Sequence, residues 1–123
     1  MASPDNTTPN NSIAEPASHY ELRAHMFKAL AHPLRLQMLE KLKEHPWCVC
    51  ALAKELEVGK STASKYLSQL KEAGLIADER HGTLVMYHLI APCVLELASC
   101  AEGAVLLNRQ RRLGIPAAEQ TDQ

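Results

Sequence analysis

Proline and glycine divide the middle of this chain into short blocks. The dividing residues are Pro33, Pro46, Gly59, Gly74, Gly82 and Pro92. Proline disrupts a helix interior but suits its first turn, and glycine commonly follows the last helical residue. Between these points, apolar residues recur every three or four positions, as they do on one face of a helix. The sequence therefore predicts short amphipathic helices, the first over 20–31 and the second from Pro33 to Pro46.

Two further helical blocks, residues 50–56 and 60–73, are separated by a tight turn that contains Gly59. In the second block, the residues predicted to face inward are Ala63, Tyr66, Leu67 and Leu70. The residues left on its outer face are Ser61, Ser64, Lys65 and Ser68. A short helix, a glycine-containing turn and a helix with small, polar and basic residues outside indicate a helix-turn-helix. We call residues 60–73 the recognition helix.

Two extended stretches and one more helix follow the recognition helix. Residues 75–80 and 84–89 flank the turn His81-Gly82-Thr83, which predicts a β-hairpin wing. Pro92 then opens a last helix that runs to the basic residues 109–112. The predicted fold is mainly α with a small β-hairpin. It is a winged helix-turn-helix of order α-α-α-α-β-β-α, with the C-terminal helix used for dimerisation.

The two ends of the chain differ from its middle. Residues 1–17 are rich in Pro, Asn, Thr and Ser, and residues 114–123 are similar, so we expect flexible tails around one domain over residues 18–113. No apolar run reaches the roughly 20 residues that cross a bilayer, and the first residues lack a signal-peptide pattern. We therefore expect a cytoplasmic protein without a membrane partner, whose four cysteines are reduced.

Positive charge is concentrated in one segment, although the formal net charge is only −1. Residues 60–71 carry three lysines and no acid. Such a basic stripe suits the phosphates of double-stranded operator DNA, and polar side chains beside it can reach base edges. The predicted DNA contacts are Lys60, Ser61, Thr62, Ser64 and Lys65 of the recognition helix with Arg80 and His81 of the wing.

The last helix carries an apolar stripe that a domain of this size has little core to cover. Pairing with the same helix of a second copy is the simplest way to bury it. We therefore expect a C2 homodimer. The residues predicted at its interface are Leu22, Met26, Leu97, Cys100, Ala104 and Leu107.

Six segments agree in order and spacing with one known family. They are KALAHPLRL at 28–36, CVCAL at 48–52, STASKYL at 61–67, LKEAGLI at 70–76, RHG at 80–82 and YHL at 87–89. Over about residues 20–105 the chain resembles the ArsR/SmtB family of metal-sensing repressors. The resemblance implies a homodimer that binds a palindromic operator upstream of resistance genes and releases it when an inducer binds.

Four cysteines are candidates for the inducer site that this resemblance implies: Cys48, Cys50, Cys93 and Cys100. Residues two apart point to different sides of a helix, so Cys48 and Cys50 can share an ion only if Cys48 precedes the helix. Cys93 and Cys100 are two helical turns apart, roughly 10.5 Å, too far to share an ion bound at about 2.3 Å. The preferred set is Cys48, Cys50 and Cys93, with Cys100 as the substitute. The alternative for each cysteine is packing as a small apolar residue.

The chain departs from the family pattern in two places. Ala51 and Ala53 stand where arsenic sensors usually have an acidic residue and often a third cysteine. Cys93, Glu96 and Cys100 stand where zinc sensors have Asp, His and Glu ligands. Three thiolates suit arsenite and antimonite, whereas four suit cadmium, lead or zinc. The predicted inducer is therefore As(III) or Sb(III), with Cd(II), Pb(II) and Zn(II) as alternatives.

Two other functions use the same cysteines. The first is a repressor of the same fold that senses oxidants or sulfane sulfur through a disulfide or sulfur bridge. The second is a small cysteine enzyme, which the lack of a Cys-x-x-Cys spacing disfavours. Two sets of residues are predicted to be structural or at the surface: His32, His45 and His88, and the packed tyrosines Tyr66 and Tyr87.

Overall fold

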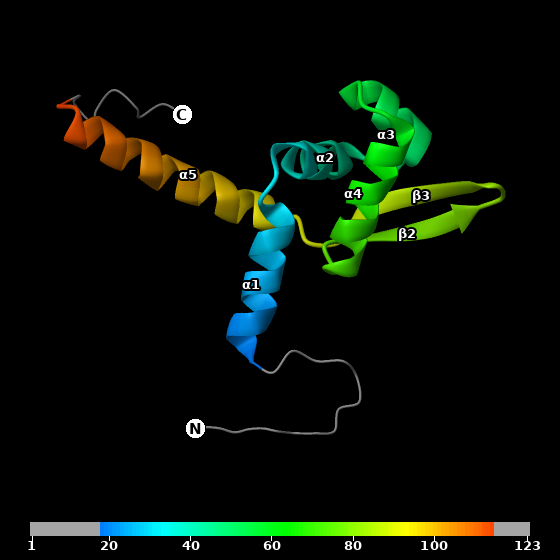
Figure 1. Ribbon diagram of the computed structural model, residues 1–123, viewed down its shortest axis with the longest axis horizontal. Helices are drawn as coiled ribbons and strands as arrows, with labels where there is room; N and C mark the ends of the chain where they lie inside the picture. Colours follow the sequence, from blue (N-terminus) through cyan, green and yellow to red (C-terminus); the bar gives the residue numbers. More distant parts are fainter. Residues whose placement is uncertain (1–17, 115–123) are drawn as a thin grey trace. The chain divides into compact units, whose positions relative to one another are not determined.

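The computed structural model describes residues 18–114 of the 123-residue chain (Figure 1). The predicted tails, apart from Gly114, lie outside the described residues. The elements are α1 (His19–Leu30), α2 (Pro33–Glu44), β1 (Trp47–Cys48), α3 (Val49–Leu56), α4 (Lys60–Glu72), β2 (Ile76–His81), β3 (Leu84–Leu89) and α5 (Cys93–Arg112).

The chain divides after Ile90 into two compact units. The first holds α1–α4 and the sheet, and the second holds α5. The predicted order of helices and hairpin is confirmed, with β1 as an additional strand.

The core of the first unit comes from the inner faces of α2, α3 and α4 and from the start of β2. Its buried residues are Met38, Leu39, Leu42, Leu52, Ala53, Ala63, Leu67, Leu70, Leu75 and Ile76. Each buried leucine or methionine side chain contributes about 1.5–3 kcal/mol by leaving water. The predicted inward positions of α4 are buried at Ala63, Leu67 and Leu70, and half-buried at Tyr66.

The turn between α3 and α4 contains Gly59, as predicted, but its left-handed residue is Glu57. Glu57 ends α3 in the left-handed region, at φ 59 and ψ 46, and its N–H bonds back to the carbonyls of Ala53 and Lys54. Gly59 has φ −66 and is the N-cap of α4. The left-handed conformation that favours glycine is instead found in this protein after α4, where Gly74 has φ +85, and in the wing turn, where Gly82 has φ +68.

The sheet has three antiparallel strands in the order β1-β3-β2. The hairpin pairs Ile76 with Leu89 at one end and His81 with Leu84 at the other. On the other edge of β3, Trp47 pairs with Tyr87 and Cys48 with Met86. The chain leading into α3 is therefore paired with the middle of β3.

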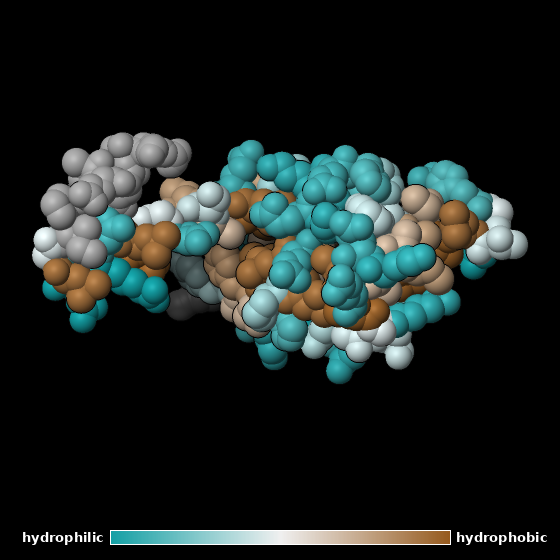
Figure 2. Space-filling model, turned by 90° about the horizontal axis from the view of Figure 1, so that it is seen from above, coloured by the Kyte–Doolittle hydropathy of each residue, from teal (hydrophilic) through white to brown (hydrophobic). Residues whose placement is uncertain are grey.

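The second unit is the single helix α5, which follows Pro92 and ends before Gly114, at φ +81. Val94 and Leu95 near its start are buried, whereas Leu97, Val105 and Leu106 are exposed. Figure 2 shows such hydrophobic residues, in brown, among hydrophilic ones on α5, at the left of the view. Among the described residues, no helix is both long and apolar enough to cross a membrane.

Candidate nucleic-acid interface and thiol site

The first turn and the outer face of α4 carry five of the predicted DNA-contact side chains. All five of them are exposed: Lys60, Ser61, Thr62, Ser64 and Lys65. The buried residues Ala63, Leu67 and Leu70 lie on the side of α4 opposite Ser61 and Lys65, as the 3.6-residue period requires. Lys60 is in line with the buried residues and is exposed because it begins the helix. The N-cap Gly59 provides no side-chain hydrogen bond to the first turn. The backbone N–H groups in the first turn of α4 are therefore available to a phosphate, which helix N-termini bind well.

The wing presents its two predicted contact residues next to the hairpin turn. Arg80 and His81 end β2 and are both exposed. The Arg80 guanidinium donates to the carbonyl of Gly82 at 3.5 Å. His81 Nε2 lies 3.7 Å from the carboxylate of Glu79. The wing therefore offers one arginine whose positive charge no acid pairs among the described residues.

The first turn of α2 is joined to the recognition helix by a hydrogen bond. His32 is the N-cap of α2, and its Nδ1 accepts the N–H of Leu34 at 3.0 Å. A neutral His32 ring then carries its proton on Nε2, which lies 3.1 Å from the hydroxyl of Tyr66 on α4 and donates to it. The structural roles predicted for His32 and Tyr66 agree with these contacts.

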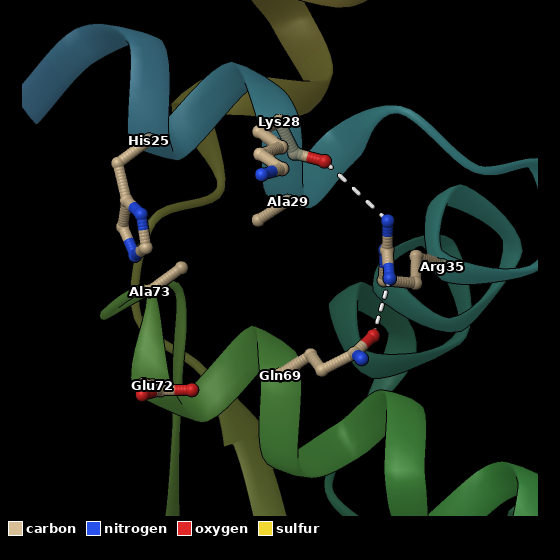
Figure 3. Close-up of a pocket in the computed structure, with 7 residues that line it drawn as sticks. All are labelled: His25, Lys28, Ala29, Arg35, Gln69, Glu72 and Ala73. Carbon is tan, nitrogen blue, oxygen red and sulfur yellow. Dashed lines mark hydrogen bonds between the residues drawn. The ribbon is translucent and has the colours of Figure 1, made fainter. Parts of the chain in front are cut away.

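Arg35 strengthens the same contact, and the sequence did not single it out. Its guanidinium carbon lies 5.3 Å from the centroid of the Tyr66 ring, within the range of a cation–π interaction. Its Nη1 donates to Oε1 of Gln69, also on α4 (Figure 3). In the sequence, Arg35 precedes the buried Met38 and Leu39 by one helical turn, and this spacing alone could have indicated that its side chain lies near the core.

Cys48 and Cys50 lie at the start of the first helix of the helix-turn-helix. Cys48 is the last residue of β1 and the N-cap of α3, with extended backbone at φ −88 and ψ 162. It is half-buried, whereas Cys50, in the first turn of α3, is exposed. The condition that Cys48 must precede the helix is therefore met.

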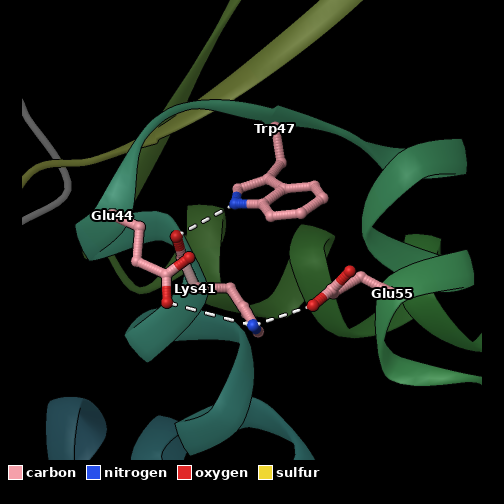
Figure 4. A network of polar contacts seen from close by, with 4 residues as sticks. All are labelled: Lys41, Glu44, Trp47 and Glu55. Atoms are coloured by element: carbon pink, nitrogen blue, oxygen red, sulfur yellow. Dashed lines mark hydrogen bonds and ion pairs between the residues drawn. The ribbon is translucent and has the colours of Figure 1, made fainter.

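A polar network holds both ends of α3 on α2 (Figure 4). The indole N–H of Trp47, just before Cys48, donates to the carbonyl of Lys41 at 3.0 Å. The Lys41 ammonium bonds to Glu55 near the end of α3 at 2.9 Å and lies 3.9 Å from Glu44. The hydrogen bond to Glu55 raises the pKa of Lys41 above its ordinary value, and the charge of Glu44 adds to this. The segment that carries Cys48 is thus tied to α2 at both sides.

The other two cysteines are on α5. Cys93 is its first residue and Cys100 lies two turns later, and both are exposed. All four cysteines are free thiols. Within each unit, residues 18–114 contain no group of three His, Cys, Asp or Glu side chains arranged to hold a metal ion.

The residues predicted at a dimer interface are accessible. Leu22, Leu97, Cys100 and Ala104 are exposed, and Met26 and Leu107 are half-buried. No residue of α1 is buried. The sequence missed four further exposed apolar residues on these helices: Tyr20, Phe27, Val105 and Leu106. They lie outside the apolar stripe that the helical period predicts on each of these helices, so the period gave no reason to include them in the predicted interface.

Comparison with known proteins identifies the kind of DNA-binding domain. Residues 32–78 match the profile of a family described as bacterial regulatory protein, arsR family. The uncharacterised HTH-type transcriptional regulator Rv0081 of Mycobacterium tuberculosis is 37% identical over 83 residues, which cover 67% of this chain and 73% of that protein. Its crystal structure superposes with a TM-score of 0.64 and 34% identity, covering 76% of this chain and 95% of that one.

Two other relatives carry more specific descriptions. The arsenic resistance transcriptional regulator ArsR1 of Pseudomonas putida is 42% identical over 65 residues, which cover 52% of this chain and 51% of that protein. The homodimeric winged helix-turn-helix DNA-binding domain of Mb0332 from Mycobacterium bovis is 29% identical, with a TM-score of 0.63. That match covers 75% of this chain and 85% of the domain.

The matched family and these relatives are described as transcriptional regulators rather than enzymes, and the two solved structures share the fold of this chain. The cysteine enzyme considered from the sequence is therefore set aside. The chain belongs to the ArsR/SmtB family of winged helix-turn-helix transcriptional regulators.

Proposed function

We propose that the protein is a cytoplasmic, homodimeric repressor that releases its operator when cysteine thiolates bind arsenite or antimonite. The observation that carries the proposal is the position of Cys48 as the N-cap of α3, with Cys50 in the first turn. At these positions the two thiols need not point to opposite sides of a regular helix. Sulfur ligands favour soft ions, and three of them suit a trivalent metalloid.

The third thiolate is proposed to come from Cys93, with Cys100 as the substitute. Both side chains are exposed, so either is accessible to an ion. One ion cannot take both from a single helix, because two turns separate them by roughly 10.5 Å. Recruiting both α5 cysteines from different chains would give a four-thiolate site, which suits Cd(II), Pb(II) or Zn(II).

The DNA-binding surface is proposed to be the outer face of α4 with the wing residues Arg80 and His81. Two copies are needed because a palindromic operator presents two half-sites. The exposed apolar residues of α1 and α5 supply a surface for that pairing. The homodimeric state described for the Mb0332 domain supports the same assembly here.

Inducer binding is proposed to act by shifting populations between two arrangements of the dimer. Drawing Cys48 and Cys50 onto one ion moves the start of α3, which packs on α4 in the helix-turn-helix. An altered spacing of the two recognition helices then no longer matches the operator. A tenfold loss of operator affinity requires only about 1.4 kcal/mol of coupling.

A gel-shift titration of the reduced full-length protein with its operator tests this function. Saturating arsenite is expected to weaken operator binding at least tenfold, and Cys48→Ser and Cys50→Ser are each expected to abolish that response. Ala51→Ser is the matched control, because it adds a hydroxyl to the exposed surface of α3 and leaves every thiol in place. Unchanged operator affinity in saturating arsenite, antimonite and cadmium would rule the proposal out.

A thiol-based redox or sulfane-sulfur sensor is the second candidate, and the exposure of Cys50, Cys93 and Cys100 supports it. Exposed thiols are accessible to oxidants and persulfides. Mass spectrometry separates the two functions. A metalloid site gains the mass of the element less the thiol protons that it displaces. A redox site gains sulfur, or loses two hydrogen atoms as a disulfide forms and the added oxidant takes up the two electrons.

A further inference from the structure

A cavity of about 210 Å³ lies between α1, α2 and the C-terminal half of α4 (Figure 3). Its lining contains neither a cysteine nor a residue of the outer face of α4. Its polar lining consists of His25 and Lys28 from α1, Arg35 from α2, and Gln69 and Glu72 from α4. Two permanent cations and one carboxylate therefore surround a space that can hold only a small molecule.

Arg35 is the cation of this cavity that is partly shielded from water, whereas Lys28 is exposed. Arg35 is half-buried, and its two terminal nitrogens donate to neutral acceptors, Oε1 of Gln69 and, at 3.4 Å, the carbonyl of Lys28. Its Nε is buried and has no hydrogen-bond partner among the described residues. No carboxylate in residues 18–114 forms an ion pair with it. Keeping a cation partly out of water without a counter-charge is unfavourable, so an anion here is stabilised.

We propose that this cavity binds a small organic carboxylate between Arg35 and Lys28. The planar guanidinium matches a carboxylate in geometry, and such charge-assisted hydrogen bonds are stronger than those to neutral acceptors. The bound carboxylate takes over the place of the Gln69 amide oxygen as acceptor. Glu72 disfavours more highly charged anions such as phosphate, because its own negative charge lines the same space.

Such a ligand would contact the recognition helix directly. Gln69, Glu72 and Ala73 all belong to α4 or its C-cap, and Arg35 lies 5.3 Å from the Tyr66 ring centroid. The site therefore provides a second input to operator binding. It is independent of the thiols and does not rest on the proposed metalloid response.

Solution NMR of the ¹⁵N-labelled full-length protein tests the site. Acetate and propionate are added at constant ionic strength, with sodium chloride and inorganic phosphate as comparisons. The expected result is a saturable shift of the Arg35 Nε–H and Gln69 side-chain amide signals with the carboxylates. Arg35→Gln is expected to weaken carboxylate binding about tenfold, the loss of about 1.4 kcal/mol of binding free energy.

Lys28→Gln keeps the test decisive if Arg35→Gln does not fold. Lys28 is exposed, and its side chain makes no hydrogen bond or ion pair recorded among the described residues, so its loss should leave the fold intact. The matched control is Arg23→Gln, which removes one exposed charge from α1 outside the cavity. Weaker binding in Lys28→Gln but not in Arg23→Gln supports the site. The proposal is overturned if the carboxylates give no saturable shifts or if phosphate binds more tightly than they do. It is also overturned if Lys28→Gln and Arg23→Gln change carboxylate affinity equally.

Discussion

The hydroxyl of Tyr66 lies 3.1 Å from Nε2 of His32, which is 34 positions earlier in the chain. The same imidazole caps α2 through its other nitrogen. One side chain thus joins the first turn of α2 to the middle of the recognition helix, behind the face proposed to meet DNA. The orientation of α4 relative to α2 depends on this contact and on the neighbouring Arg35.

Tyr66→Phe should remove this hydrogen bond and keep the ring. The free energy of unfolding is expected to fall by about 0.5–1.5 kcal/mol, the usual net value of one hydrogen bond. His32→Asn is the companion variant, because asparagine can still cap α2 but cannot reach Tyr66 in the same way. Urea denaturation of both single variants and of the double variant gives their coupling. Strictly additive effects would show that the two residues do not interact in solution.

The Lys41–Glu55 contact predicts an alkaline dependence of stability. Because the folded pKa of Lys41 is raised, its contribution is present below the ordinary value of about 10.5 and is lost as pH rises through the folded pKa. Titration of the Lys41 side-chain carbon by NMR should give a lower midpoint in Glu55→Gln than in the unmodified protein. Equal midpoints would mean that the hydrogen bond is absent in solution.

Lys60 separates DNA binding from stability. It is the first residue of α4, where a positive charge is unfavourable beside the helix N-terminus. Lys60→Gln should therefore leave the stability unchanged or slightly higher. Operator affinity should fall, and its slope against log salt should become shallower by roughly 0.9 if the lysine meets one phosphate. Lys43→Gln, an exposed lysine on α2, is the control and should alter neither the affinity nor the slope.

The helical period of the sequence was sufficient to predict the exposed face of α4 but not the short strand β1. The exposure of Ser61, Ser64 and Lys65 follows from the spacing of the buried residues on the same helix. The two-residue strand β1 is too short to show any period, and it exists only because Trp47 and Cys48 pair with β3.

Tertiary contacts decide the rest of the candidate site. Arg35 reaches Gln69 across 34 positions, and no local pattern encodes that hydrogen bond. Glu57, rather than Gly59, takes the left-handed position because the hydrogen bonds at the end of α3 fix that residue. The choice of cysteines for the inducer site also depends on tertiary contacts. Spacing in the sequence excludes one ion shared by Cys93 and Cys100 of a single helix, but it cannot show which other thiols would complete the site.

The homodimer can be tested with two leucines of nearly equal exposure. Leu97 on α5 is 47% exposed and belongs to the predicted dimer interface, whereas Leu84 beside the wing turn is 48% exposed and does not. Burying Leu97 against a second copy would occur twice in a C2 dimer, so a charge there is costly at two positions. Leu97→Glu should therefore sediment as a monomer in analytical ultracentrifugation, and Leu84→Glu should remain a dimer. If both variants keep the mass of the unmodified protein, α5 does not form the interface. If the unmodified protein itself is a monomer, pairing through α5 is wrong, and the two-half-site binding that depends on it fails as well.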